Sequence, residues 1–155
     1  MTNDDKQPAG RPPSAGRLAV RNPGALVFAA EMYGLQLDQL AALTGGERSA
    51  RAAASRWREL GYVETARLTP GAAWLWVTRA GMAACGLGYR PGQPGFAQLA
   101  HIRAVAAARI ALEATDGYQA ASAFWRCERR IRSRHGVGVR QHLPDAEVQD
   151  RKSVV

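Results

Sequence analysis

Arginine is the residue type whose chemistry is most evident in this sequence. Its guanidinium group carries a permanent positive charge and a planar fork of N–H donors, which fits phosphate oxygens and the guanine edge of a base pair. The segment ERSARAAASRWRELGYVE, residues 47–64, concentrates such side chains between alanines and one tryptophan. At 3.6 residues per turn, one side of a helix collects small and apolar residues: Ala50, Ala53, Ala54, Trp57 and Leu60. The other side carries polar residues: Arg48, Arg51, Ser55 and Arg58, with Arg56 on one flank.

A helix with this pattern fits a nucleic-acid contact, in which the apolar side packs on the protein and the basic side enters a major groove. The alternative is a charged face that contacts only water. Glu47 and Glu59 favour this alternative, because their negative charges weaken the attraction of the helix to an anion. The formal net charge of +8 favours an anionic partner, which can be a nucleic acid, an acidic protein or an anionic membrane surface. Charge alone does not separate these three classes.

Two short helices are expected before the basic helix. Asn22 and Pro23 form a typical helix start, and apolar residues at helical spacing follow up to Gly34. The segment LDQLAAL, residues 37–43, predicts the second helix, with Asp38 in its first turn. A Thr-Gly-Gly turn then precedes the basic helix.

A β-hairpin is expected after the basic helix. Gly61 fits the left-handed position that closes a helix, and residues 62–78 alternate in hydrophobicity on either side of a Thr-Pro-Gly turn. Trp74, Trp76 and Thr78 fall on one face, and Thr78 also caps a short helix. This order of elements predicts a winged helix-turn-helix over residues 21–87, mainly α with a small β wing, of the α+β class. The predicted contacts to double-stranded DNA are Arg48, Ser49, Arg51, Ser55, Arg56, Arg58, Arg67 and Thr69.

The second half is expected to consist of a Pro/Gly linker at residues 88–96, a long helix, and a basic extension, together reaching residue 150. The long helix, residues 97–114, has a broad apolar face that could pack on the winged domain or form the seam of a homodimer. We interpret His101 as a hydrogen-bonding residue at the boundary of that face, because no second metal ligand lies near it in the sequence.

The basic extension predicts short elements and a second charged patch. Phe124 and Trp125 indicate a strand, residues 128–134 a turn or short helix, and Val137, Val139 and Leu143 another strand. The patch is a second candidate nucleic-acid contact, for which a solvated surface is the alternative. It comprises Arg126, Arg129, Arg130, Arg132 and Arg134.

Other features restrict the class of protein. Residues 1–20 are rich in proline, glycine and charge, which predicts a disordered tail. Cys85 and Cys127 fit no metal or redox spacing, so we expect reduced packing residues and neither a metal nor a cofactor. The sequence contains no apolar run long enough for a membrane span and no N-terminal hydrophobic signal core. We therefore expect a cytoplasmic protein without a membrane partner.

Four segments resemble parts of the replication-relaxation-type proteins of actinobacterial plasmids, integrative elements and phages. They are WVTRAGMAACGLGY, LAHIRAVAAARIALE, FWRCERRIR and HLPDAEV, and the resemblance extends over about residues 22–149. It implies a winged helix joined to a region like a restriction-endonuclease core, with a role in mobile-element maintenance, transfer or regulation. It also implies that Asp145, in the segment His142-Leu143-Pro144-Asp145, corresponds to the first acid of a metal-dependent nuclease site.

The sequence departs from the nuclease pattern after Asp145. That pattern requires a second acid and a lysine on a following strand, and only Glu147 and Lys152 stand nearby. We therefore predict a DNA-binding regulator or accessory factor of a mobile element, acting in replication, transfer or transcription, and not an enzyme. The alternatives are an Mg²⁺-dependent nuclease-like protein, or a fragment of one, and a winged-helix module that binds another protein.

Overall fold

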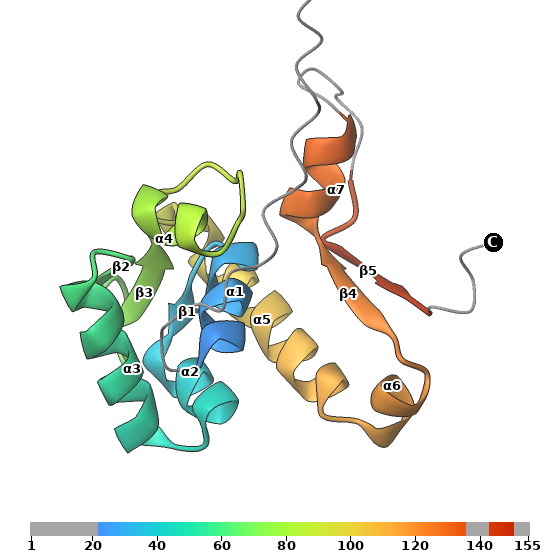
Figure 1. The fold of residues 1–155 in the computed structure, drawn as a ribbon, viewed down its shortest axis with the longest axis horizontal. Coiled ribbons are helices and arrows are strands. Elements are labelled where there is room, and N and C mark those ends of the chain that lie inside the picture. The colour runs from blue at the N-terminus through green and yellow to red at the C-terminus, as the bar shows by residue number, and fades with distance from the viewer. Residues whose placement is uncertain (1–21, 136–142, 151–155) are drawn as a thin grey trace, which may run out of the picture.

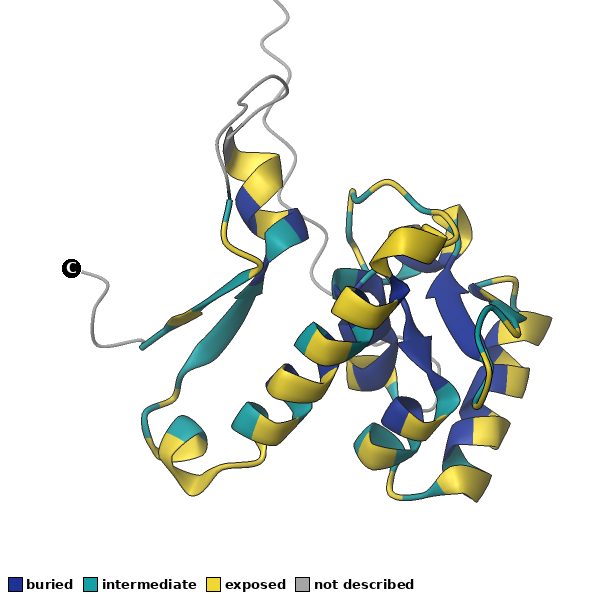
Figure 2. Cartoon of the chain, turned by 180° about the vertical axis from the view of Figure 1, so that it is seen from behind, coloured by how far each residue is buried: buried dark blue, intermediate teal, exposed yellow. Residues whose placement is uncertain are grey.

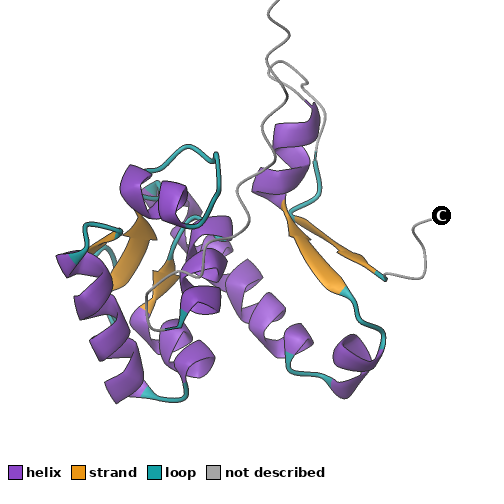
Figure 3. Cartoon of the chain, in the orientation of Figure 1, coloured by secondary structure: helices purple, strands orange, loops and turns teal. Residues whose placement is uncertain are grey.

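The computed structural model of this 155-residue chain describes residues 22–135 and 143–150. The predicted tail at residues 1–20 lies outside the described residues, as do Val137 and Val139 of the predicted second strand. The structure combines helices with two small antiparallel sheets, one of three strands and one of two strands (Figures 1 and 3). The α+β class expected from the sequence is confirmed.

The first helix, α1 (Pro23–Glu31), begins where the sequence predicted, but its cap differs. Asn22 has a left-handed backbone with φ 56°, and its side chain makes no cap hydrogen bond. A capping side chain requires an extended backbone at that position, so the expected Asn22 cap does not form. Helix α2 (Leu37–Thr44) is confirmed, and its first turn is closed by the side chains of Gln36 and Gln39.

The basic helix, α3 (Glu47–Glu59), packs its small residues against α2, as predicted. Ala50, Ala53, Ala54 and Trp57 are buried, and Trp57 has no exposed surface. Leu60 was expected on the same side but is only half-buried, because it follows the last helical residue. The alanines bring the backbone of α3 close to its neighbours, while Trp57 is the largest side chain that α3 buries.

Strand β3 (Trp74–Val77) is the centre of the three-stranded sheet, with β1 (Leu35–Gln36) on one side and β2 (Val63–Ala66) on the other. Val63 pairs with Val77 and Ala66 with Trp74, so the predicted hairpin is confirmed. Strand β1 was not predicted, because two residues between two helices carry no strand signal. It pairs Leu35 with Leu75.

All four residues of β3 are buried, whereas the sequence analysis placed only Trp74, Trp76 and Thr78 on a common face and assigned no partner to the other face. Leu75 and Val77 belong to the core shared with α1, α2 and α3. Trp74 and Trp76 form a second cluster with two residues of helix α5 (Leu99–Glu113), Leu99 and Ile102. Helix α5 therefore covers the far face of the sheet, so the expected packing of its apolar face on the preceding elements is observed.

Helix α4 (Arg79–Ala84) follows β3 directly, and the Thr78 hydroxyl accepts a hydrogen bond from the Gly81 amide at 3.2 Å, as predicted for a cap. A short 3₁₀ helix, η1 (Phe96–Gln98), leads into α5. Arg109 lies on the apolar side of α5 and is buried, which the sequence did not indicate. Its guanidinium donates to Glu31 and Glu113, each at 2.7 Å, and lies 4.2 Å from the centre of the Phe28 ring.

The C-terminal part comprises α6 (Asp116–Ala120), β4 (Phe124–Cys127), α7 (Glu128–His135) and β5 (Ala146–Gln149). The strand at Phe124 and the helix after it are confirmed. The expected strand around Leu143 is wrong for that residue, since pairing begins only at Ala146. Pro144 has no N–H to donate to a strand partner, which fits this later start.

The C-terminal hairpin and α7 lie beyond α5, away from α3 (Figure 1). Buried residues gather in the part built from α1 to α4 and the three-stranded sheet (Figure 2). The hairpin itself is mostly half-buried.

We predict that Gly81→Ala lowers the free energy of unfolding by about 1–3 kcal/mol through overpacking. A Cβ atom at Gly81 would stand 2.2 Å from the Tyr62 carbonyl oxygen and 2.6 Å from Val77 Cγ1. Gly24→Ala is the matched control, because Gly24 is also helical and a Cβ there has nothing within 4 Å. Thermal melting measures both variants. Equal stability of the Gly81 variant and the wild type would contradict this close approach.

Candidate nucleic-acid interface

The outer side of α3 presents its polar residues to solvent. Arg48, Arg51, Ser55, Arg56 and Arg58 are all exposed, as the helical spacing predicted. Ser49 is half-buried, at the edge of the packed side. Burial of the alanines and Trp57 fixes the rotation of the helix about its axis, and this rotation turns the arginines outward.

Two of these arginines are paired along the helix. Arg51 donates to Glu47 at 3.4 Å, and Arg56 to Glu59 at 3.2 Å. Such exposed pairs stabilise a protein little, but they place a carboxylate beside the guanidinium that an anion would approach. Arg48 and Arg58 make no ion pair with any residue that the structure describes, so their charges are the freest on α3.

The loop between β2 and β3, residues 67–73, carries the two other predicted DNA contacts. Arg67 is exposed. Thr69 is half-buried, and its hydroxyl oxygen accepts hydrogen bonds from Trp74 Nε1 at 3.0 Å and Gln36 Nε2 at 3.4 Å. We therefore assign Thr69 to the support of the β2–β3 loop and Arg67 to its outer surface.

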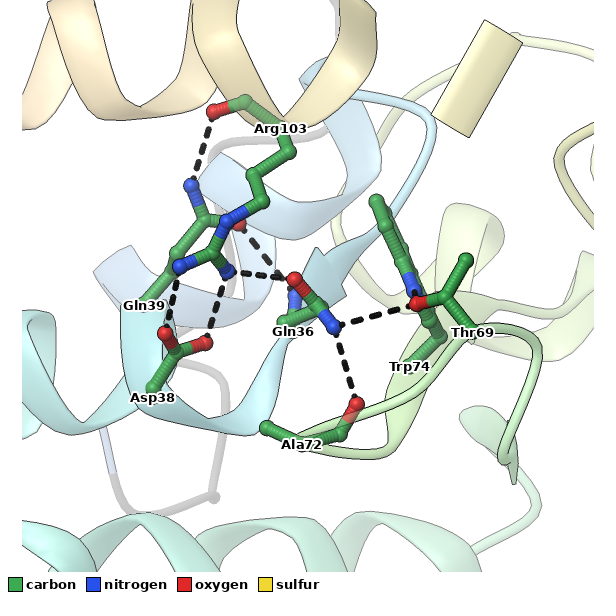
Figure 4. A network of polar contacts seen from close by, with 7 residues as sticks. All are labelled: Gln36, Asp38, Gln39, Thr69, Ala72, Trp74 and Arg103. Carbon is green, nitrogen blue, oxygen red and sulfur yellow. Dashed lines mark hydrogen bonds and ion pairs between the residues drawn. The ribbon is translucent and has the colours of Figure 1, made fainter. Parts of the chain in front are cut away.

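A polar network with residues from β1, α2 and α5 supports this loop (Figure 4). The Gln36 side chain donates to the Ala72 carbonyl oxygen at 2.9 Å, and its own carbonyl oxygen accepts from Arg103. Arg103 also forms a two-pronged pair with Asp38, at 2.9 and 2.7 Å. The hydrogen bond from Arg103 holds the pKa of the Asp38 carboxyl below its usual value of 3.8.

Sequence reasoning missed this network. Arg103 stands 67 residues from Gln36 and 65 from Asp38, and no local pattern joins positions so far apart. Asp38 was noticed only as an acid in the first turn of a helix. A buried glutamine beside a two-residue strand has no sequence signature of its own.

The predicted second basic patch is corrected by the position of Arg129. This residue is buried, with 8% of its surface exposed, and burial lowers the pKa of its guanidinium. It donates to the carbonyl oxygens of Ala30 and Arg90, and its guanidinium carbon lies 4.2 Å from the centre of the Tyr33 ring. Arg129 joins α7 to α1 and the linker, so it is not available for a nucleic acid.

Two further members of that patch are paired with acids. Arg126 is mostly buried and donates to Glu147 at 2.7 Å across the C-terminal hairpin, and Arg132 pairs with Glu128 one turn before it on α7. Arg130 and Arg134 are exposed and make no ion pair with a described residue. The Glu128–Arg132 pair has the local i,i+4 spacing of a helix, which the sequence analysis did not use. The partners of Arg126 and Arg129 lie on other elements, so no local pattern could indicate them.

Asp145 does not stand in a cluster of acids among the described residues. Its Oδ1 lies 3.0 Å from His101 Nε2, which confirms the hydrogen-bonding role expected for that histidine. Residues 22–135 and 143–150 contain no group of three His, Cys, Asp or Glu side chains arranged to hold a metal ion. His142 and Lys152, which the nuclease interpretation invoked, lie outside the described residues.

The two cysteines are free and fit the packing role expected for them. Cys127 is buried and Cys85 half-buried, and burial raises the pKa of the Cys85 thiol to about 11. A thiol with this pKa stays protonated at neutral pH, so it is a poor nucleophile.

No protein-family model, curated protein or solved structure matches this chain. In the part of the chain that the structure describes, no helix is both long and apolar enough to cross a membrane.

The depressed pKa of Asp38 gives a pH prediction. A carboxyl whose pKa is lower in the folded state stabilises the fold above its unfolded pKa, and this contribution is lost as the pH falls through the folded value. In Arg103→Met, the pKa of Asp38 is expected to rise toward 3.8. Asp38 then no longer stabilises the fold at neutral pH, and the variant lacks the part of the acid-induced loss of stability that the wild type shows as the pH falls from 3.8 through its folded pKa. NMR titration of the Asp38 carboxyl measures the shift. Arg51→Ala is the control and leaves Asp38 unchanged; an unchanged Asp38 in Arg103→Met would contradict the pairing.

Proposed function

We propose that residues 22–87 form a winged helix-turn-helix that binds double-stranded DNA. The order α1, α2, α3 and then the β2–β3 hairpin supports this proposal, with α3 as the recognition helix and the hairpin as the wing. The observation that carries it is the division of α3 into a buried side around Trp57 and an exposed side with arginines and Ser55.

The expected binding mode follows from the chemistry of that exposed side. Arginine forks suit guanine N7 and O6 in the major groove, and they also suit backbone phosphates. Arg48 and Arg58 are the strongest candidates, because no acid among the described residues competes for them. Arg67 in the wing would contact the backbone or the minor groove.

The biological setting is proposed from the resemblance to replication-relaxation-type proteins. It supports a regulator or accessory factor that acts in the replication, transfer or transcription of a mobile element. A homodimer through residues 97–114 stays a prediction. Leu99, Ile102 and Ala106 of α5 are buried by the chain itself, so such a dimer would use the exposed side of the helix and the half-buried residues of its apolar face.

The surroundings of Asp145 favour DNA binding without DNA cleavage. A nuclease site holds Mg²⁺ with several carboxylates free to bind it. Here Asp145 lies against His101 and Glu147 against Arg126, so each acid already has a cationic or hydrogen-bonding partner.

We predict that Arg48→Ala/Arg58→Ala weakens DNA binding more than Arg51→Ala/Arg56→Ala does. Both double variants remove two arginines from α3, but the first removes the two that have no acidic partner. Loss of a guanine contact costs about 1–3 kcal/mol, and loss of a phosphate contact lowers the salt slope by about one unit. Fluorescence titration of a random duplex at several salt concentrations measures both quantities.

The outcomes of this comparison separate the candidate functions. Thermal melting confirms that both variants are folded. Equal losses in the two variants would mean that only the total charge matters. A wild-type protein with no affinity for duplex DNA would favour the protein-interaction module instead.

We predict that the chain binds supercoiled plasmid without nicking it in Mg²⁺ or Mn²⁺. Gel electrophoresis of plasmid incubated with the wild type and with Asp145→Ala is the measurement. Metal-dependent nicking that disappears in the Asp145 variant would support the nuclease alternative.

A further inference from the structure

We propose that Arg103 of α5 is a positioning residue for the β2–β3 loop. It acts through Gln36 and thereby sets the affinity of the wing for DNA. This inference rests on the proposed function, and it assigns to the second half of the chain a role in the DNA contact made by the first half.

Strand pairing between β2 and β3 ends at Ala66 and Trp74, and one backbone hydrogen bond, from Leu37 to the Ala73 carbonyl oxygen at 2.9 Å, holds the end of the β2–β3 loop. The rest of the loop is supported by side chains. Gln36 is the central support. Its side-chain nitrogen donates to the Ala72 carbonyl oxygen at 2.9 Å and to the Thr69 hydroxyl at 3.4 Å. Gln36 is also buried, so an amide turned the wrong way would leave its polar atoms without partners.

Arg103 and the Ala72 carbonyl oxygen together determine which way that amide points. A glutamine amide has a donor end and an acceptor end of nearly the same shape, whereas a guanidinium can only donate. The Arg103 donor therefore requires the Gln36 oxygen on its side and leaves the NH₂ group for the loop (Figure 4). Without Arg103, the amide oxygen loses its donor, and the hydrogen bond to the Ala72 carbonyl oxygen has to hold the amide alone.

Asp38 holds the Arg103 guanidinium in the position from which it donates to Gln36. The two-pronged Asp38 pair, at 2.9 and 2.7 Å, aligns the plane of the guanidinium. The Arg103 backbone oxygen also accepts from Gln39 Nε2 at 2.9 Å. A lysine at this position has one compact ammonium and cannot hold Asp38 in a fork while it meets Gln36 in the same geometry.

Helix α5 does not depend on Arg103 for its attachment. Leu99 and Ile102 bury against Trp74 and Trp76, and this apolar contact fixes the helix on the sheet. The Arg103 side chain is 43% exposed and its charge is balanced by Asp38. Loss of the contact between Arg103 and Gln36 is therefore expected to affect the orientation of the Gln36 amide more than the free energy of unfolding.

The test is a double-mutant cycle on DNA affinity, with Arg103→Met and Arg67→Ala. We expect Arg103→Met alone to weaken binding by about three- to tenfold, the effect of one lost hydrogen-bonded support. In the Arg67→Ala background, Arg103→Met is expected to lower the DNA affinity by less than about twofold, because the contact between Arg67 and DNA is already absent. The matched cycle with Arg48→Ala on α3 is expected to be additive. Additivity with Arg67→Ala would overturn the proposal.

Asp38→Ala and Arg103→Lys distinguish positioning from simple electrostatics. Asp38→Ala removes a negative charge, so attraction of charge alone predicts tighter DNA binding, whereas positioning predicts weaker binding. Arg103→Lys keeps the charge but not the fork, and it is expected to resemble Arg103→Met. Tighter binding by Asp38→Ala, or full wild-type affinity of Arg103→Lys, would contradict the proposal.

A measurement without DNA separates this inference from the proposed function. Amide hydrogen exchange of residues 67–73 is expected to be about three- to tenfold faster in Arg103→Met, with exchange in α3 unchanged. Faster loop exchange in a protein that does not bind DNA would refute the DNA-binding function and leave the positioning of the loop intact. Unchanged loop exchange would overturn the positioning role, whatever the affinity for DNA.

Discussion

Strand β3 has apolar side chains on both faces, and both faces must be shielded from water. Leu75 and Val77 face the core made with α1, α2 and α3, while Trp74 and Trp76 are buried beneath α5. A two-stranded hairpin alone is at most marginally stable in water, so the added strand β1 and the covering helix are what make this hairpin a fixed part of the fold. The position of α5 follows from this requirement, and the elements after α5 are attached through it and through α1.

Buried arginines join the second half of the chain to the first. Arg109 lies between Glu31 and Glu113 and against the Phe28 ring, and Arg129 contributes its donors to backbone carbonyls of α1 and the linker. A buried charge is costly unless it is paired or hydrogen-bonded. Arg109 is paired with two carboxylates, whereas Arg129 is held by carbonyl oxygens and aromatic rings. The strongly basic composition therefore serves two physical purposes. Some guanidinium groups fix internal contacts, and others remain at the surface for an anionic partner.

The proposed DNA contact combines a rigid part and an adjustable part. The orientation of α3 is set by tight packing of alanines and Trp57, which allows little rotation about the helix axis. The β2–β3 loop is held instead by a few hydrogen bonds that end in the exposed Arg103–Asp38 pair. Interactions of this kind are sensitive to pH and to single substitutions, so the loop is the part of the contact that the rest of the chain can influence.

The sequence by itself determined the elements whose signal is local. The basic helix and its rotation, the hairpin and the start of α1 follow from periodicity, glycine and proline, because these patterns depend on neighbours within a few residues. The tertiary structure alone decided which arginines are buried. Arg48 and Arg129 are equivalent in the sequence, yet one is exposed and the other is buried against Tyr33, because long-range packing brings carbonyl oxygens and aromatic rings to Arg129. The same holds for Gln36 and Arg103, whose hydrogen bond joins positions 67 residues apart and exists only because α5 covers β3.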